Sequence, residues 1–119
     1  MTFNIYMKRY IKSSILPGKY NIDVPYGNLR YSVCQSDGVP SYIYLHGISV
    51  NPSSRGQGIG TELLRKLISI SDHYKLPIEL QVAPILDSPM SADDLKHWYS
   101  QNGFVVEHGN SMIYYPKYT

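Results

Sequence analysis

Apolar positions recur along the chain with either a helical or a strand period, and these two patterns predict its secondary structure. The clearest helical pattern covers residues 58–74, where an apolar stripe predicts an amphipathic helix. The stripe consists of Ile59, Leu63, Leu64, Leu67, Ile68, Ile70 and Tyr74. A second helix is predicted to begin after Ser91, a good N-cap, and to run to about Asn102, with Gly103 ending it.

Alternating apolar and polar residues predict strands in the rest of the chain. The predicted strands cover residues 2–9, 28–35, 41–50, 78–83, 104–107 and 111–115. A Ser-Asp-Gly turn at 36–38 and a Gly-Asn turn at 109–110 favour two hairpins. Residues 10–25 contain two prolines and are predicted to hold at most a short helix near 10–15.

A helix between two strands requires a crossover, so the strands before and after the first helix should be parallel neighbours. The order predicts an α/β fold, with a central mixed sheet flanked by helices. At 119 residues, the chain is expected to form one domain, residues 1–119, with one core.

Composition narrows the functional classes. With 43% hydrophobic and 17% charged residues, the chain fits a soluble globular protein. A net charge of +2 gives no reason to expect nucleic acid or a membrane surface as partner. Cys34 is the single cysteine, which excludes an internal disulfide and favours an intracellular, cytoplasmic location. Neither a signal peptide nor an apolar run of membrane-spanning length is visible.

The segment between the third strand and the first helix is rich in glycine. Gly56, Gly58 and Gly60 stand at every second position, directly before the amphipathic stripe. Such a turn directs backbone N–H groups and the positive end of the helix dipole at a ligand, and glycine lets that ligand approach closely. The pattern predicts a cradle for an anion such as phosphate or pyrophosphate.

The spacing of the glycines separates this turn from two other phosphate-binding motifs. No Gly-x-x-x-x-Gly-Lys-Ser/Thr string is present, which excludes a P-loop. A dinucleotide-binding turn needs glycine where Thr61 stands. Glu79, at about the distance of the ribose-binding acid, falls inside a predicted strand.

Two motifs carry a resemblance to a known family. Arg55-x-x-Gly58-x-Gly60 resembles the acetyl-CoA-binding motif Arg/Gln-x-x-Gly-x-Gly/Ala of the GNAT acetyltransferases. Residues 95–104, with Tyr99 four positions before Gly-Phe, are similar to the family's second motif. The resemblance implies the GNAT fold and an acetyl-CoA-dependent N-acetyltransferase that acts on a primary amine of a small molecule or a protein.

By this resemblance, acetyl-CoA is the co-substrate. No metal is expected, because the histidines lack metal-ligand spacing and the sequence has no Cys/His cluster. Residues 55–61 would hold the pyrophosphate through backbone N–H groups, and residues 48–50 would carry the pantetheine arm. The Val50 N–H would bond the acetyl carbonyl as an oxyanion donor. The expected cofactor-binding residues are Ile48, Ser49, Val50, Arg55, Gly56, Gln57, Gly58, Ile59, Gly60, Thr61 and Tyr99.

Acetyl transfer also needs a proton for the leaving thiolate and a base for the amine. Tyr99 is the candidate general acid, with Tyr114 or Tyr115 as substitutes. His46 is the candidate base, directly or through water, at a position where some relatives carry a catalytic histidine. Glu107, near where other relatives place a glutamate, is the second candidate base. The alternative is that Tyr99 and His46 serve packing alone.

Three departures from the family pattern leave other functions open. The region before residue 28 is short where relatives place two helices that form one wall of the acceptor pocket. Ala92 replaces a frequent asparagine, and residues 41–50 lack the catalytic glutamate of many relatives. The alternatives are a non-catalytic acyl-CoA-binding module and a protein-interaction module. Small amines, peptide N-termini and lysine side chains are all open as acceptors, and a homodimer is possible.

Overall fold

The computed structural model describes residues 15–83 and 90–117. The predicted strand at 2–9 lies outside these residues, as does nearly all of the predicted helix at 10–15. No helix in the described ranges is long and apolar enough to cross a membrane.

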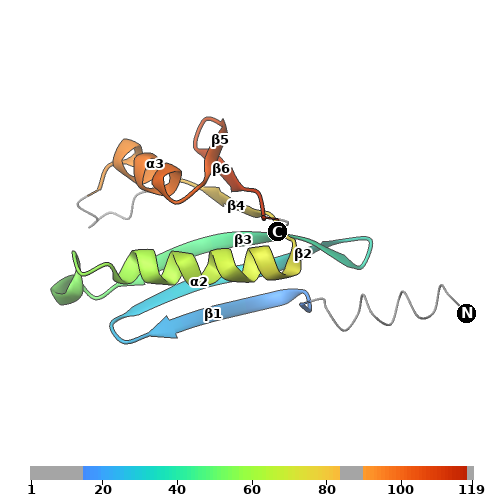
Figure 1. Cartoon of the computed structure of the whole chain (residues 1–119), viewed down its shortest axis with the longest axis horizontal. Coiled ribbons are helices and arrows are strands. Elements are labelled where there is room, and N and C mark those ends of the chain that lie inside the picture. The colour runs from blue at the N-terminus through green and yellow to red at the C-terminus, as the bar shows by residue number, and fades with distance from the viewer. Residues whose placement is uncertain (1–14, 84–89, 118–119) are drawn as a thin grey trace, which may run out of the picture.

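Within residues 15–83 and 90–117, six strands form one mixed sheet in the order β1-β2-β3-β4-β6-β5, and two helices pack against it (Figure 1). The strands are β1 (Gly18–Val24), β2 (Gly27–Ser36), β3 (Val39–Val50), β4 (Ile78–Gln81), β5 (Val105–His108) and β6 (Ser111–Tyr114). The helices are α2 (Ile59–Tyr74) and α3 (Ala92–Gln101), and a short 3-10 turn covers Pro52–Ser54. The predicted α/β class and the predicted order from the second strand onward are confirmed.

Strand β1 was not predicted from the sequence. Pro17 directly precedes it and Pro25 directly follows it, so the two prolines flank the strand and do not interrupt it. Between them the pattern alternates, with Tyr20, Ile22 and Val24 less exposed than their neighbours. The expectation of at most a short helix in this region is therefore wrong for residues 18–24.

The predicted hairpin between β2 and β3 is confirmed. Its two turn residues, Asp37 and Gly38, have φ of 52° and 79°. Positive φ at both central positions is the geometry that matches the twist of paired strands.

Helix α2 crosses from β3 to β4, and these strands are parallel, as expected. Its buried residues, Leu63, Leu64, Leu67 and Ser71, form a narrower stripe than predicted. Ser71 is buried in place of a larger apolar residue because its hydroxyl donates to the Leu76 carbonyl, just past the end of the helix.

The sheet has two unlike faces. Ile43, Ile78 and Tyr114 are register partners across β3, β4 and β6 on the inner face, which packs against α2. The Tyr114 hydroxyl donates to Asp72 of α2 (2.9 Å), and its ring lies 5.5 Å from that of Phe104, which follows α3. The helices and the core therefore share the inner face.

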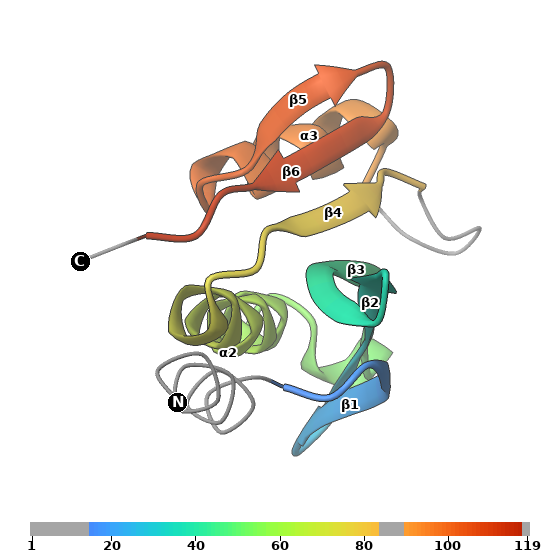
Figure 2. The same ribbon diagram turned by 90° about the vertical axis from the view of Figure 1, so that its right-hand side faces the viewer.

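The opposite, outer face carries a polar row across four strands: Lys19, Ser32, Tyr44 and Glu79 are successive register partners. Seen along the strands, α2 lies on one side of β1–β3, and no described helix lies over the other side (Figure 2).

Candidate acyl-CoA site

Strands β3 and β4 separate and leave a cleft between them. They are paired only at Ile43–Ile78 and Tyr44–Glu79, and beyond these pairs the two strands diverge toward their C-terminal ends. A cleft of about 650 Å³ opens there, bounded by the ends of both strands, the N-terminus of α2 and one side of α3. The carboxyl ends of strands flanked by helices are a common place for ligands in α/β sheets.

A β-bulge in β3 lies beside the cleft, which is lined by residues from both faces of the sheet. Arg30 pairs with Gly47 and Tyr31 with Leu45, so His46 is an extra residue on β3. Such a bulge interrupts the alternation of side chains. The cleft is lined from the inner face by Leu45, Ile48, Val50 and Leu80, and from the outer face by His46, Ser49 and Gln81. It therefore passes through the sheet.

At the inner end of the cleft, the N-terminus of α2 offers unused donors. Gly58 is the N-cap and has no side-chain cap, and the first intrahelical bond runs from the Glu62 N–H to the Gly58 carbonyl. The N–H groups of residues 59–61 therefore have no intrahelical acceptor. They are available to an anion at the positive end of the helix dipole.

The glycines of the turn differ in their backbone conformation and in the space beside them. Gly56 and Gly58 have φ of 83° and 78°, and a Cβ on either would meet no atom within 4 Å, so both border open space. Gly60 has no such backbone constraint, and a Cβ there would make ordinary contact with Trp98 at 3.7 Å. Arg55 also lines the cleft, whereas Gln57 does not.

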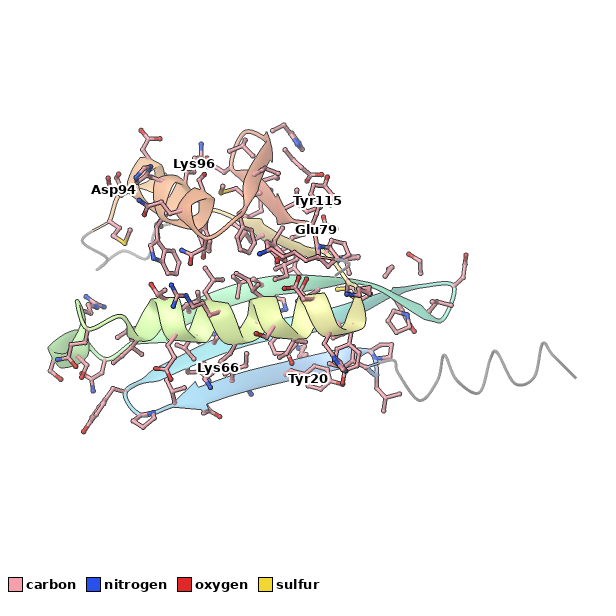
Figure 3. All side chains as sticks on the ribbon, viewed as in Figure 1. Tyr20, Lys66, Glu79, Asp94, Lys96 and Tyr115 are labelled. Carbon is pink, nitrogen blue, oxygen red and sulfur yellow. The ribbon has the colours of Figure 1, made fainter. Side chains whose placement is uncertain are left out.

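Helix α3 closes the side of the cleft with aromatic rings. The indole Nε1 of Trp98 donates to Thr61 Oγ1 (3.3 Å), which joins α3 to the first turn of α2. Figure 3 shows Lys96 on the side of α3 that faces away from α2, so the helix turns its aromatic side to the cleft.

Tyr99 lies in the same wall, with its ring 5.0 Å from that of Trp98 and 5.4 Å from that of Phe104. Burial raises the pKa of Tyr99 to about 12, so its hydroxyl keeps its proton at neutral pH. Within the described residues this hydroxyl forms no hydrogen bond. It is a free donor on the wall of the cleft.

His46 lies at the outer end of the cleft and is exposed. Its Nε2 is 2.7 Å from Ser32 Oγ, and its ring meets the Tyr44 ring edge-on at 5.1 Å. These contacts orient the ring and engage Nε2. In the tautomer that carries its proton on Nε2, the Ser32 oxygen accepts that hydrogen and Nδ1 is an acceptor.

The other catalytic candidates lie elsewhere. Glu107 is exposed on β5, at the edge of the sheet, and does not line the cleft. Neither Tyr114, whose hydroxyl is bound to Asp72, nor the exposed Tyr115 lines it. Within residues 15–83 and 90–117, no three His, Cys, Asp or Glu side chains gather into a possible metal site.

Part of the cleft wall was not predicted from the sequence. The additional lining residues are Leu45, Leu80, Gln81, Ala83, Met90, Leu95 and Trp98. The end of β4 could have been found, because the strand after a crossover helix ends at the same edge as the strand before it. For Met90 no sequence signal was available.

Comparison with known proteins defines the class of this fold and site. The profile of the acetyltransferase (GNAT) family matches residues 12–104, so the chain belongs to that family. No curated protein matches the sequence.

Solved structures with the same fold include proteins of different size. The anti-CRISPR protein AcrVA5 is similar with a TM-score of 0.70 and 25% identity, over 82% of this chain and 98% of that one. The ribosomal-protein-S18-alanine N-acetyltransferase from Escherichia coli gives 0.60 and 14%, over 94% and 77%. The PaiA N-acetyltransferase from Thermoplasma acidophilum, in complex with coenzyme A, gives 0.55 and 21%, over 78% and 54%. This chain thus spans about half the length of the Thermoplasma enzyme.

Proposed function

We propose that the protein is an acetyl-CoA-dependent N-acetyltransferase that transfers an acetyl group to a primary amine. The observation that carries the proposal is the cleft through the sheet, with free helix N–H groups at its inner end and a histidine at its outer end. The coenzyme A in the structure of the Thermoplasma relative supports the choice of cofactor.

Acetyl-CoA would supply the acetyl group as an activated thioester. The free N–H groups of residues 59–61 and the Arg55 guanidinium would hold its pyrophosphate. Ile48 and Val50 would line the path of the pantetheine arm, with the Val50 N–H as oxyanion donor. Because one cleft would hold both reactants in a fixed orientation, the bimolecular step would become effectively unimolecular.

The proton-handling groups divide between the two ends of the cleft. His46, with Nε2 held by Ser32, would accept a proton from the amine at Nδ1, directly or through water. Tyr99 would donate a hydrogen bond to the departing thiolate sulfur. The acceptor amine would enter from the outer face, where the histidine lies.

Two glycines allow a matched test of cofactor binding. Gly58 and Gly38 have φ of 78° and 79°, and a Cβ on either would meet no atom within 4 Å, so a glutamate costs the same backbone strain at both. Only Gly58 lies in the cleft. We expect Gly58→Glu to weaken acetyl-CoA binding at least tenfold, about 1.4 kcal/mol, and Gly38→Glu to leave it unchanged.

Calorimetric titration measures the acetyl-CoA affinity of both variants, and thermal unfolding of the wild type tests whether acetyl-CoA binds at all. Acetyl-CoA at a hundred times its Kd adds ~2.7 kcal/mol, which raises the Tm of a domain of this size by roughly 10 °C. Free CoA should act similarly and ATP should not. No shift with either CoA species would refute cofactor binding and leave the protein-interaction alternative.

Turnover then separates the enzyme from a non-catalytic acyl-CoA-binding module. Release of free thiol is followed with a panel of amines. An enzyme requires thiol release that depends on the amine, and a decrease in this rate in His46→Ala would support His46 as the base. Binding of acetyl-CoA without turnover of any amine would favour the binding module.

A further inference from the structure

The outer end of the cleft lies beside a guanidinium that has no acidic partner in the described part of the chain. Arg30 is an exposed residue of β2, and its Nη1 donates a long hydrogen bond (3.4 Å) to Oγ of Ser49, which lines the cleft. No ion pair involves this guanidinium within residues 15–83 and 90–117. Asp23, an acid on the same face of β1, instead accepts a hydrogen bond from Asn28 Nδ2 (2.6 Å).

The backbone next to the guanidinium leaves room for it. Arg30 and Gly47 are register partners on the outer face, and a Cβ on Gly47 would overlap the Arg30 Nη2 atom. Gly47 is not among the residues with positive φ, so its missing side chain serves space and not backbone conformation. The glycine thus lets the guanidinium lie across β3, beside the bulge that carries His46.

This arrangement sets a requirement for the acceptor. A guanidinium presents a planar fork of donors that suits carboxylate and phosphate, and the Ser49 hydroxyl adds a further polar group beside it. A simple alkylammonium that enters the outer end of the cleft would meet the uncompensated positive charge of Arg30. An amine that also carries an anion would instead gain a partner for Arg30.

We propose that Arg30 and Ser49 form an anion-binding subsite for the acceptor, which is therefore a primary amine that also carries a carboxylate or a phosphate. The proposal rests on the proposed N-acetyltransferase function and names its substrate class. Because residues rise about 3.4 Å along a strand, the anion would lie within a few ångströms to about 10 Å of His46. A short linker between amine and anion spans that range.

Matched amine pairs test the subsite. β-Alanine is compared with propylamine, and phosphoethanolamine with ethanolamine, so each pair differs in its anionic group. Both pairs are titrated into the protein saturated with CoA, and kcat/KM is measured with acetyl-CoA. We expect the wild type to prefer at least one anionic amine by roughly tenfold or more. The pair that shows the preference distinguishes carboxylate from phosphate.

Three variants attribute the preference to this guanidinium. Arg30→Gln removes its charge, and Gly47→Ala keeps the charge but displaces it from β3. Both should reduce the anionic preference to less than threefold. Lys19→Gln, which removes a charge from the same face on β1, should keep the preference.

Other outcomes would overturn the proposal. If the wild type binds both anionic amines no better than their neutral counterparts, the anion subsite is refuted and the acetyltransferase assignment stays in place. A preference for anionic amines that is kept in Arg30→Gln would also refute the subsite. A loss of CoA affinity in Arg30→Gln, with the amine preference intact, would place Arg30 in the cofactor site. Absence of any turnover would refute the proposed function, and the calorimetric comparison would still decide whether Arg30 binds anions.

Discussion

Replacing Tyr99 by phenylalanine removes one hydroxyl from the wall of the cleft and keeps the aromatic ring. The pKa of Tyr99 is about 12 and that of an ordinary thiol is about 8.5. Complete proton transfer from Tyr99 to a thiolate would therefore be uphill by roughly 3.5 pKa units, about 5 kcal/mol. The hydroxyl should instead stabilise the thiolate as a hydrogen-bond donor. A hydrogen bond to a charged group contributes ~1.5–3 kcal/mol, so Tyr99→Phe should lower kcat roughly 10- to 150-fold.

Stability measurements separate this effect from a damaged fold. The Tyr99 hydroxyl has no hydrogen bond within the described residues, and the ring contacts with Trp98 and Phe104 stay, so the free energy of unfolding at pH 7 should change by less than ~0.5 kcal/mol. Urea unfolding measures it, and calorimetric titration shows whether acetyl-CoA binding is kept.

The elevated pKa of Tyr99 adds a signature at alkaline pH. The unfolded chain loses the Tyr99 proton near pH 10, whereas the folded protein holds it to about pH 12. The stabilisation is thus fully present below pH 10 and is lost as the pH rises toward 12, amounting to about 2.7 kcal/mol. Tyr99→Phe lacks this contribution, so its unfolding free energy should fall less steeply over that range.

Two results would refute this reasoning. A decrease in kcat of less than threefold would contradict a Tyr99 hydroxyl that bonds the departing thiolate. Identical pH dependence of unfolding between pH 10 and 12 for wild type and variant would contradict the elevated pKa.

Two further pairs of substitutions probe the base and the core. Ser32→Ala should lower kcat several-fold with little change in KM for acetyl-CoA, because the His46 ring loses the contact that fixes it. Ser32→Thr, which keeps the hydroxyl, should restore kcat in steady-state assays, and equal kcat in all three proteins would exclude a role for this contact. Leu67 is fully buried on α2, so Leu67→Ala should lower the free energy of unfolding, measured with urea, by ~2–5 kcal/mol. Leu16 is 74% exposed, so Leu16→Ala should change it by less than ~0.5 kcal/mol. Equal losses in the two variants would contradict the described core.

Local patterns in the sequence were enough to predict the elements whose signals are local. The helical period of residues 58–74 predicted α2 to within one residue, and Ser91 as an N-cap predicted the start of α3, where the structure shows a capping box with Asp94. The hairpin turn at 36–38 was predicted from its glycine. β1 was missed because its own pattern is short and polar, and its inward residues are only half-buried.

The candidate site was predictable where a motif lies on one element. The glycine turn, Tyr99 and His46 were each singled out from sequence, and the fold brings them to one cleft. Glu107 was singled out by its distance from a motif, and its place on the outermost strand depends on the strand order, which the sequence alone does not fix. Likewise, the contribution of Leu80 depends on where β4 leaves β3, a property of long-range pairing.

The cleft through the sheet gives the two ends of the site different freedom to change over evolutionary time. Its inner end is formed largely by main-chain groups of a turn and a helix start, which keep their positions through most side-chain replacements. Its outer end is formed by side chains of β3 and β4, each of which a single codon change can replace. Proteins with this fold can therefore change their acceptor specificity through substitutions at the outer end while the inner end stays the same.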